Sequence, residues 1–199
     1  MSLLVTIFNY GAGNLYSIQA ALKKEGVRSR LTKGASSLAD SDAILLPGVG
    51  SFTQATKMLP MEEIRDAVQS GQPLLGICLG LQLFFGRSEE GPGKGLSLLT
   101  GTVERLPPTV KVPQSGWNTL KIRNSSELAT GLPDEPWVYY VHSYYPVTDG
   151  PWVTATSEYG VEYASIVAWK NIYGTQFHPE KSGRTGRTIL RNFLRSVRR

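Results

Sequence analysis

Cysteine and histidine are scarce in this sequence, which contains one Cys and two His among 199 residues. A single thiol forms no internal disulfide, fits a reducing compartment and excludes zinc sites built from several thiolates. No cluster of His, Asp and Glu residues has the spacing of metal ligands. Two glycine-rich segments, 11–16 and 91–95, lack the residues that complete a dinucleotide- or phosphate-binding loop. We therefore expect no metal and no other cofactor.

Long apolar runs are absent as well. No run approaches the roughly 18 residues that a membrane-spanning helix needs. The opening segment MSLLVTIFNYGAG is apolar, but it has neither a basic leader nor a small-residue cleavage site. We interpret it as a first strand and expect a cytoplasmic protein with no membrane partner.

The length and the composition indicate one folded unit. A chain of 199 residues suits a single domain, so we expect one domain over residues 1–199. An α/β core of this size buries about 70% of the surface of the unfolded chain, which is enough without a disulfide or a metal. The hydrophobic content of 41% is ordinary for a globular protein.

The net charge of +5 is concentrated near the end of the chain. Seven of the 21 basic residues lie in 181–199, a segment without any acidic residue. Apolar residues recur there at helical spacing, which predicts a final helix with a buried stripe and arginines on its solvated face. This stripe consists of Ile189, Leu190, Phe193, Leu194 and Val197. The helix has no interleaved aromatic residues for base stacking, so we expect no nucleic-acid partner. Contact with an acidic partner remains open.

Strand and helix signals alternate in the first half of the chain. Apolar strands are expected at Leu3–Phe8, Val27–Leu31, Ala43–Leu46 and Pro73–Ile77. Helices are expected from Asn14, around Ile64, and over Leu79–Phe85. This order predicts a parallel sheet with helices on both faces.

The second half contains closely spaced strands separated by proline and glycine. They are expected at Val103–Arg105, Thr119–Ile122, Val138–Val141, Val153–Thr156, Glu162–Trp169 and Ile172–Gln176. Such spacing favours an antiparallel extension that precedes the final helix. The fold class predicted is α/β: a flavodoxin-like open, mostly parallel sheet with an antiparallel extension.

Cys78 lies in the segment Gly76-Ile77-Cys78-Leu79-Gly80, between a predicted strand and a predicted helix. Glycines two residues away on both sides permit a tight turn that exposes a nucleophile at the edge of a sheet. A following helix favours the thiolate at its N-terminus. An inert buried cysteine is the alternative, but this context favours a nucleophile.

Each histidine follows a strand, and a nucleophilic thiol needs one of them as a base. His178 is followed by Glu180, and in an extended segment these two residues share a side. The carboxylate then orients the imidazole and stabilises its protonated form. A structural histidine at a strand end remains the alternative for His178, and it is the favoured interpretation for His142.

Acyl transfer from such a nucleophile also needs donors for an oxyanion. The N–H of Leu79, directly after Cys78, is one candidate. A second can come from the turn Leu46-Pro47-Gly48-Val49-Gly50-Ser51, which follows the third strand at the same carboxyl edge of the sheet. A plain connection between strand and helix is the alternative for this turn.

Three motifs together resemble the class I, or triad, glutamine amidotransferase family. They are LPGVGSF (46–52), GICLGLQLF (76–84) and GTQFHPEKSG (174–183). The segments FNYGAGNLYSI, SGWN and YYVHSYY further resemble the branch whose glutaminase subunits supply ammonia for histidine biosynthesis, so the resemblance spans nearly the whole chain. Asn9, Leu81 and Ser115 depart from the usual residues of that branch without touching the triad.

The resemblance implies hydrolysis of glutamine to glutamate and ammonia through a thioester on Cys78. The implied triad is Cys78, His178 and Glu180. The implied glutamine-binding residues are Gly48, Val49, Gly50, Leu79, Gln82, Glu90 (for the amino group), Ser143 and Tyr144.

The resemblance also implies a heterodimer with a synthase (cyclase) partner. Because a (β/α)₈ synthase of roughly 250 residues does not fit in this chain, the acceptor reaction belongs to that partner. Ammonia in neutral water is mostly protonated, so we expect a dry passage that carries it to the partner. Trp117, Tyr139 and Lys181 are the expected contact residues, together with the basic final helix. A different ammonia acceptor, a peptidase-like relative and a non-catalytic interaction module remain alternatives.

Overall fold

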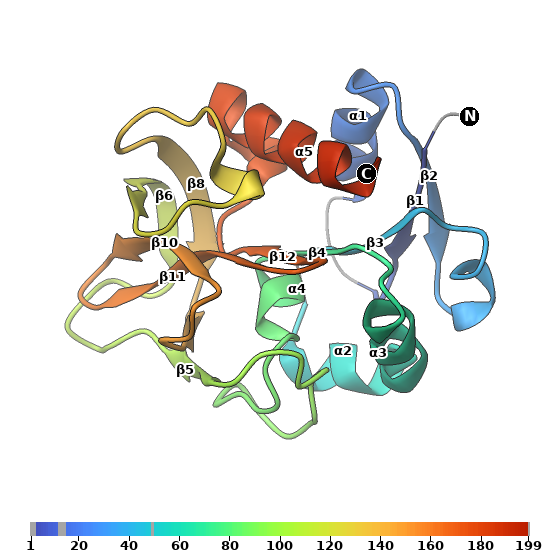
Figure 1. Cartoon of the computed structure of the whole chain (residues 1–199). Coiled ribbons are helices and arrows are strands. Elements are labelled where there is room, and N and C mark those ends of the chain that lie inside the picture. The colour runs from blue at the N-terminus through green and yellow to red at the C-terminus, as the bar shows by residue number, and fades with distance from the viewer. Residues whose placement is uncertain (1–2, 12–14, 49, 199) are drawn as a thin grey trace.

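The computed structural model describes residues 3–11, 15–48 and 50–198, and an eight-stranded sheet runs through its centre (Figure 1). Its strands are β1 (Leu4–Phe8), β2 (Arg28–Thr32), β3 (Ala43–Leu46), β4 (Leu74–Ile77), β7 (Lys121–Ile122), β10 (Val153–Glu158), β11 (Glu162–Trp169) and β12 (Ile172–Thr175). The order across the sheet is β2-β1-β3-β4-β12-β11-β10-β7. Pairing is parallel from β2 to β12 and antiparallel from β12 to β7. The mostly parallel sheet with an antiparallel extension is confirmed.

Helices cover both faces of this sheet, as predicted. Figure 1 shows α1 (Leu15–Lys24) and α5 (Gly183–Val197) on one side, and α2 (Phe52–Met58), α3 (Met61–Gln69) and α4 (Leu79–Gln82) on the other. Two buried apolar clusters separate these layers, one on each side of the sheet. Every residue of β3 and β4 is buried, which is typical of parallel strands covered on both faces.

Two short sheets flank the central one. β5 (Thr102–Arg105) pairs with β9 (Tyr144–Val147), and β6 (Gln114–Thr119) pairs with β8 (Trp137–His142). The single strand predicted over Thr119–Ile122 is wrong. The chain changes sheets at the buried Leu120, because Thr119 pairs with β8 while Lys121 and Ile122 pair with β10.

The helix predicted over Leu79–Phe85 is shorter than expected. Its α-helical part ends at Gln82, and the following hydrogen bonds are tighter: Phe84 N–H donates to the carbonyl of Leu81, and Phe85 N–H to that of Gln82. The predicted N-cap of α1, Asn14, lies outside the described residues. Three short 3₁₀ helices complete the fold: η1 (Ala35–Ser37), η2 (Glu127–Ala129) and η3 (Pro179–Lys181).

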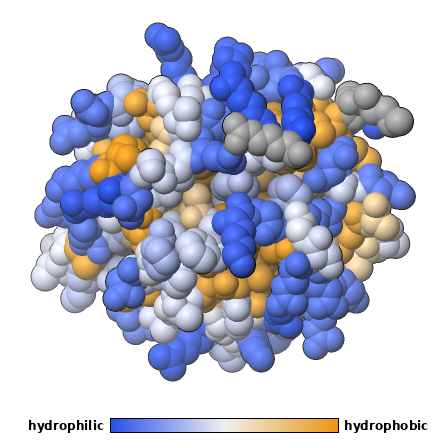
Figure 2. Space-filling view, in the orientation of Figure 1, coloured by the Kyte–Doolittle hydropathy of each residue, from blue (hydrophilic) through white to orange (hydrophobic). Residues whose placement is uncertain are grey.

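The final helix α5 has the predicted amphipathic pattern. Ile189, Leu190, Phe193 and Leu194 are buried. Figure 2 shows strongly hydrophilic side chains over the upper part of the molecule, where α5 and α1 lie. Within residues 3–11, 15–48 and 50–198, no helix is both long and apolar enough to cross a membrane.

Candidate active site

Cys78 occupies a strained turn between β4 and α4. Its φ of 50° lies in the left-handed region, which is uncommon for a residue other than glycine and is frequent at active sites. The turn depends on close backbone approach at both flanking glycines. A Cβ on Gly76 would stand 2.5 Å from the carbonyl oxygen of Gly80, and one on Gly80 would stand 2.1 Å from that of Leu46. The G-x-C-x-G segment therefore forms the tight turn that its spacing predicts.

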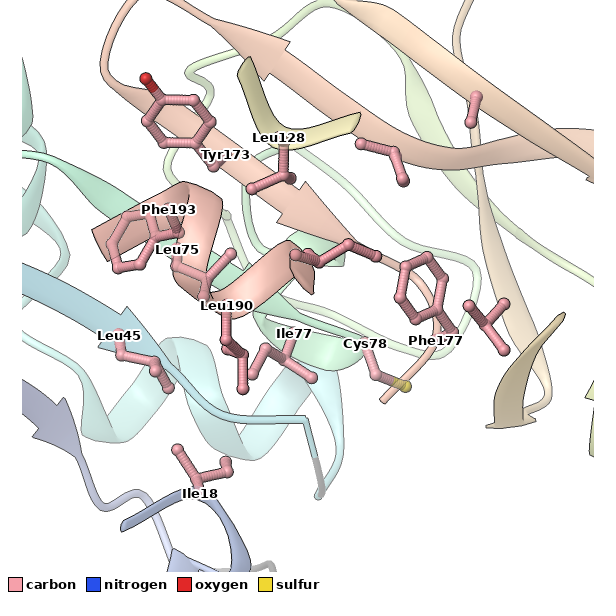
Figure 3. Close-up of a cluster of buried hydrophobic side chains, with 14 of the residues drawn as sticks. Ile18, Leu45, Leu75, Ile77, Cys78, Leu128, Tyr173, Phe177, Leu190 and Phe193 are labelled. Carbon is pink, nitrogen blue, oxygen red and sulfur yellow. The ribbon is translucent and has the colours of Figure 1, made fainter. Parts of the chain in front are cut away.

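The thiol of Cys78 lies at the margin of a buried apolar cluster. Figure 3 shows its sulfur beyond Ile77 and beside Phe177, directed away from Leu190. Sγ is 3.4 Å from Nε2 of Gln176, which donates to it, and 3.8 Å from the carbonyl oxygen of Val141. The side chain is only 4% exposed, so its reactivity depends on the polar groups around it.

His178 and Glu180 form a buried pair. Nδ1 of His178 is 2.8 Å from Oε1 of Glu180, and the two side chains are 3% and 4% exposed. The extended segment expected here is wrong, because residues 179–181 form η3. The contact is made through this turn, which folds Glu180 back toward the imidazole. Ser182 hydrogen-bonds to the carbonyl of His178, and the His178 N–H donates to the carbonyl of Tyr139, which fixes the backbone on both sides.

Gly48 brings Cys78 and His178 together. A Cβ at Gly48 would stand 2.9 Å from Cβ of Cys78 and 2.9 Å from Cε1 of His178. The two side chains therefore flank one glycine, with no room for a larger residue between them. Nε2 of His178 is buried and has no hydrogen-bond partner of normal geometry among the described residues.

The pKa values of the two histidines are shifted in opposite directions. Burial lowers the pKa of His178, but the interactions with Cys78 and Glu180 outweigh it and raise the pKa to about 10. For His142, burial dominates and lowers the pKa to about 4. Its Nδ1 lies 2.9 Å from the carbonyl oxygen of Tyr144, so Nδ1–H is the donor and Nε2 carries no proton.

The glycine-rich turn after β3 is held at both ends. The Tyr10 hydroxyl donates to the carbonyl of Pro47, and Oε2 of Glu90 accepts the Phe52 N–H at 2.7 Å. Ser51 caps α2 by accepting the Gln54 N–H through its hydroxyl. The predicted binding residue Val49 lies outside the described residues.

A cavity of about 270 Å³ opens over Cys78. Its walls are Gly48, Gly50, Cys78, Leu79, Gln82, Glu90, Pro113, Val141, His142, Ser143 and Tyr144. Every described residue of the predicted glutamine site lines it, whereas His178 lies behind Gly48. Pro113, Val141 and His142 were not predicted. The YYVHSYY motif signals two of them, because it contains Val141 and His142 beside Ser143 and Tyr144.

A larger cavity of about 540 Å³ lies between α1 and α5, away from Cys78. We place the chemistry in the smaller cavity, because the smaller one contains the thiol and the convergent polar groups. In the part of the chain that the structure describes, no group of three or more His, Cys, Asp and Glu side chains is arranged to hold a metal ion.

The three predicted contact residues meet on one exposed surface. The rings of Trp117 and Tyr139 are 6.0 Å apart in an edge-to-face arrangement, and Nζ of Lys181 is 5.8 Å from the centre of the Tyr139 ring. Trp117 is 54% exposed, and Trp137, on the same strand as Tyr139, is 59% exposed. Exposed tryptophans of this kind are typical of a protein–protein interface.

Comparison with known proteins gives a consistent result. The family profile described as glutamine amidotransferase class-I matches residues 6–197. The chain is 44% identical to "Imidazole glycerol phosphate synthase subunit HisH" of Methanothermobacter thermautotrophicus, over 98% of this chain and all of that protein. It is 46% identical to the protein of the same name from Methanosarcina mazei, over 96% of this chain and 97% of that one.

Solved structures share the fold at low sequence identity. The structure of PurLQS from Thermotoga maritima contains a chain with a TM-score of 0.80 and 19% identity, covering 98% of this chain and 99% of that one. The crystal structure of a glutamine amidotransferase from the same organism has a TM-score of 0.74 and 18% identity, covering 100% of both chains.

Proposed function

The chain belongs to the class-I glutamine amidotransferase family, and on this premise we propose that it is the glutaminase subunit of an imidazole glycerol phosphate synthase. It hydrolyses glutamine to glutamate and ammonia and passes the ammonia to a synthase (cyclase) partner in histidine biosynthesis. The observation that carries the chemistry is the strained Cys78 thiol, which lies across Gly48 from the buried His178–Glu180 pair.

Cys78 is the nucleophile of the first half-reaction. Its proton passes to Nε2 of His178, and the sulfur attacks the carboxamide carbon of glutamine while the C=O electron pair moves to oxygen. Glu180 stabilises the resulting imidazolium through the 2.8 Å contact at Nδ1. The intermediate collapses when the C–N bond breaks, and the imidazolium proton goes to the departing nitrogen, which leaves as ammonia.

Hydrolysis of the thioester completes the cycle. Water attacks the thioester carbon while Nε2 of His178 takes a proton from it. The C–S bond then breaks, Cys78 leaves as the thiolate, and glutamate is released. The raised pKa of His178 suits this end state, since it favours the imidazolium beside the sulfur.

Backbone N–H groups stabilise the oxyanion in both halves. Leu79 supplies one, because helix N–H groups in the first turn have no intrahelical partner. The turn that holds Gly48 and Gly50 supplies the other and includes Val49. Two hydrogen bonds, from the Tyr10 hydroxyl to the Pro47 carbonyl and from the Phe52 N–H to Glu90, hold this turn next to the thiol.

The remaining cavity walls bind the rest of glutamine. Glu90 binds the substrate amino group and at the same time accepts the Phe52 N–H. Gln82, Ser143 and Tyr144 bind the other polar groups of the substrate. A single carboxylate therefore contacts both the substrate and the first turn of α2.

The partner docks over Trp117, Tyr139 and Lys181. These side chains form an exposed, mutually contacting surface, and Tyr139 also contacts the triad region, since its carbonyl accepts the His178 N–H. Ammonia released into neutral water is mostly protonated and loses its nucleophilicity, so a passage that excludes water leads into the partner. The whole chain, residues 1–199, acts as one domain, and its lone cysteine supports a cytoplasmic location.

Glutamate release from glutamine tests this proposal. The purified chain is assayed by itself and with the synthase partner and its ligand, and the Cys78→Ala variant is assayed beside it. We expect strong activity in the mixture and none in the variant. Activity that the partner leaves unchanged would indicate a different acceptor. No glutamate in either assay, with a Cys78 that does not react with a glutamine-like electrophile, would contradict the enzymatic function.

A further inference from the structure

We propose that Gln176 is a further catalytic residue, which donates a side-chain N–H to the Cys78 sulfur and stabilises the thiolate, and that Gln82 positions it. The proposal rests on the proposed role of Cys78 as nucleophile. It starts from a direct contact, because Nε2 of Gln176 lies 3.4 Å from the reacting sulfur.

The hydrogen-bond pattern fixes which end of the Gln176 amide faces the sulfur. Gln82 contacts the carbonyl oxygen of Tyr144 at 2.8 Å, and a backbone carbonyl can only accept. The amide nitrogen of Gln82 must therefore lie on that side. The same nitrogen lies 3.1 Å from the Gln176 side chain, which must present its oxygen there. The other end of that amide, the N–H₂ group, is then directed at Sγ.

Burial makes this donor effective. Gln176 is fully buried and Gln82 is 4% exposed, so water does not compete for the N–H. The backbone is fixed as well, because the Gln176 N–H donates to the carbonyl of Ser165 at 2.9 Å. In such surroundings a hydrogen bond to a charged acceptor is stronger than one to a neutral acceptor.

The thiolate needs such a donor. The α-helical part of α4 is a single turn, so its dipole is smaller than the longer predicted helix would have supplied. Besides the His178 imidazole across Gly48, the sulfur contacts the carbonyl oxygen of Val141, which accepts from the thiol and repels the thiolate. When the thiol loses its proton, its hydrogen bond to the Val141 carbonyl is lost. The Gln176 N–H then remains as a donor to the sulfur, in addition to the His178 imidazolium.

The same contact acts when the thioester is hydrolysed. The sulfur is uncharged in the thioester and becomes negative as the C–S bond breaks, so the Gln176 N–H interacts more strongly with the transition state than with the thioester. Loss of the N–H is expected to slow both the formation and the hydrolysis of the intermediate.

Alkylation by iodoacetamide tests the proposal without the glutaminase assay, because Cys78 is the only cysteine in the chain. The Gln176→Met variant lacks the N–H that donates to the sulfur. Its alkylation rate at neutral pH should therefore fall about tenfold or more, and the pH profile of alkylation should move to higher pH. Gln82→Met should move it in the same direction by a smaller amount. Asn192→Leu is the matched control: this buried amide donates to the carbonyls of Leu128 and Thr130 and not to Cys78, so its loss should leave the profile unchanged.

A folded Gln176→Met protein with the parent profile would overturn the proposal, even if its glutamine hydrolysis were slow. A shifted profile in a chain that does not hydrolyse glutamine would support the contact and contradict the proposed function instead. The parent protein provides a second measurement if the variant does not fold. The Gln176 side-chain amide resonances should shift with the same pH midpoint as alkylation, and unmoved resonances would overturn the proposal.

Discussion

His178 and His142 are both buried, but their imidazoles have different neighbours. His178 has the Glu180 carboxylate at 2.8 Å and the Cys78 sulfur across Gly48. His142 has a backbone carbonyl at one nitrogen and the rings of Tyr140 and Tyr163 at 5.5 and 5.3 Å. Charge nearby favours the imidazolium of His178, and apolar burial disfavours that of His142.

At the scale of single residues, we expect the two imidazoles to titrate at opposite ends of the pH range. The pKa of His178 is raised to about 10, and that of His142 is lowered to about 4. A titration followed by ¹H–¹³C NMR resolves them easily, since the chain has only these two histidines. In Glu180→Gln, the His178 midpoint should fall while the His142 midpoint stays. Two midpoints near 6.5 would contradict the electrostatic description of this site.

At the scale of elements, close packing of the turn at Cys78 depends on glycine. The β4–α4 connection presses against the carboxyl end of β3, so Gly80 lies directly on the Leu46 carbonyl. Only a residue without a Cβ allows this approach, and the approach sets the position of the Cys78 backbone. The turn is thus a property of two strands and one helix together.

We predict that Gly80→Ala lowers the free energy of unfolding by about 3 kcal/mol, because backbone and not a flexible side chain must move. Gly34→Ala is the control. A Cβ there meets nothing within 4 Å and the φ is not in the left-handed region, so its effect should stay within about 0.5 kcal/mol. Urea unfolding measures both. Equal effects of the two substitutions would show that this turn tolerates a larger residue.

At the scale of the whole molecule, the two histidines contribute to stability on opposite sides of neutrality. The folded pKa of His142 lies below its ordinary value of 6.5, so its contribution is complete above pH 6.5 and is lost as the pH falls toward 4. The folded pKa of His178 lies above 6.5, so its contribution is complete below pH 6.5 and is lost as the pH rises through about 10.

We therefore expect His142→Gln to reduce the loss of stability in acid. Between pH 6.5 and pH 4 the free energy of unfolding of the parent should fall by about 3 kcal/mol more than that of the variant. Denaturant unfolding at several pH values gives this difference directly. The His178→Gln variant should lose stability in acid as steeply as the parent does, but it should lack the further loss that the parent undergoes between pH 6.5 and 10. Parallel acid curves for the parent and His142→Gln would contradict the prediction.

Features that depend on local pattern could be predicted from the residue order alone. Apolar runs of four to eight residues located most strands of the central sheet, and the stripe from Ile189 to Val197 located α5. The G-x-C-x-G spacing located the turn at Cys78, since glycine is needed wherever backbones touch. These features follow from the residue types within a short window, so the chain order suffices to read them.

Contacts between residues distant in the sequence could not be predicted and became visible in the folded structure. The contact of Gln176 with Cys78 joins residues 98 positions apart, and that of Gln82 with Tyr144 joins residues 62 apart. No local pattern encodes such contacts, because they arise when β12 inserts beside β4 and β8 covers the turn. The change of sheets at Leu120 could not be predicted for the same reason. Which strands pair with Thr119 and with Lys121 depends on residues elsewhere in the chain, so the pairing is set by the folded structure as a whole.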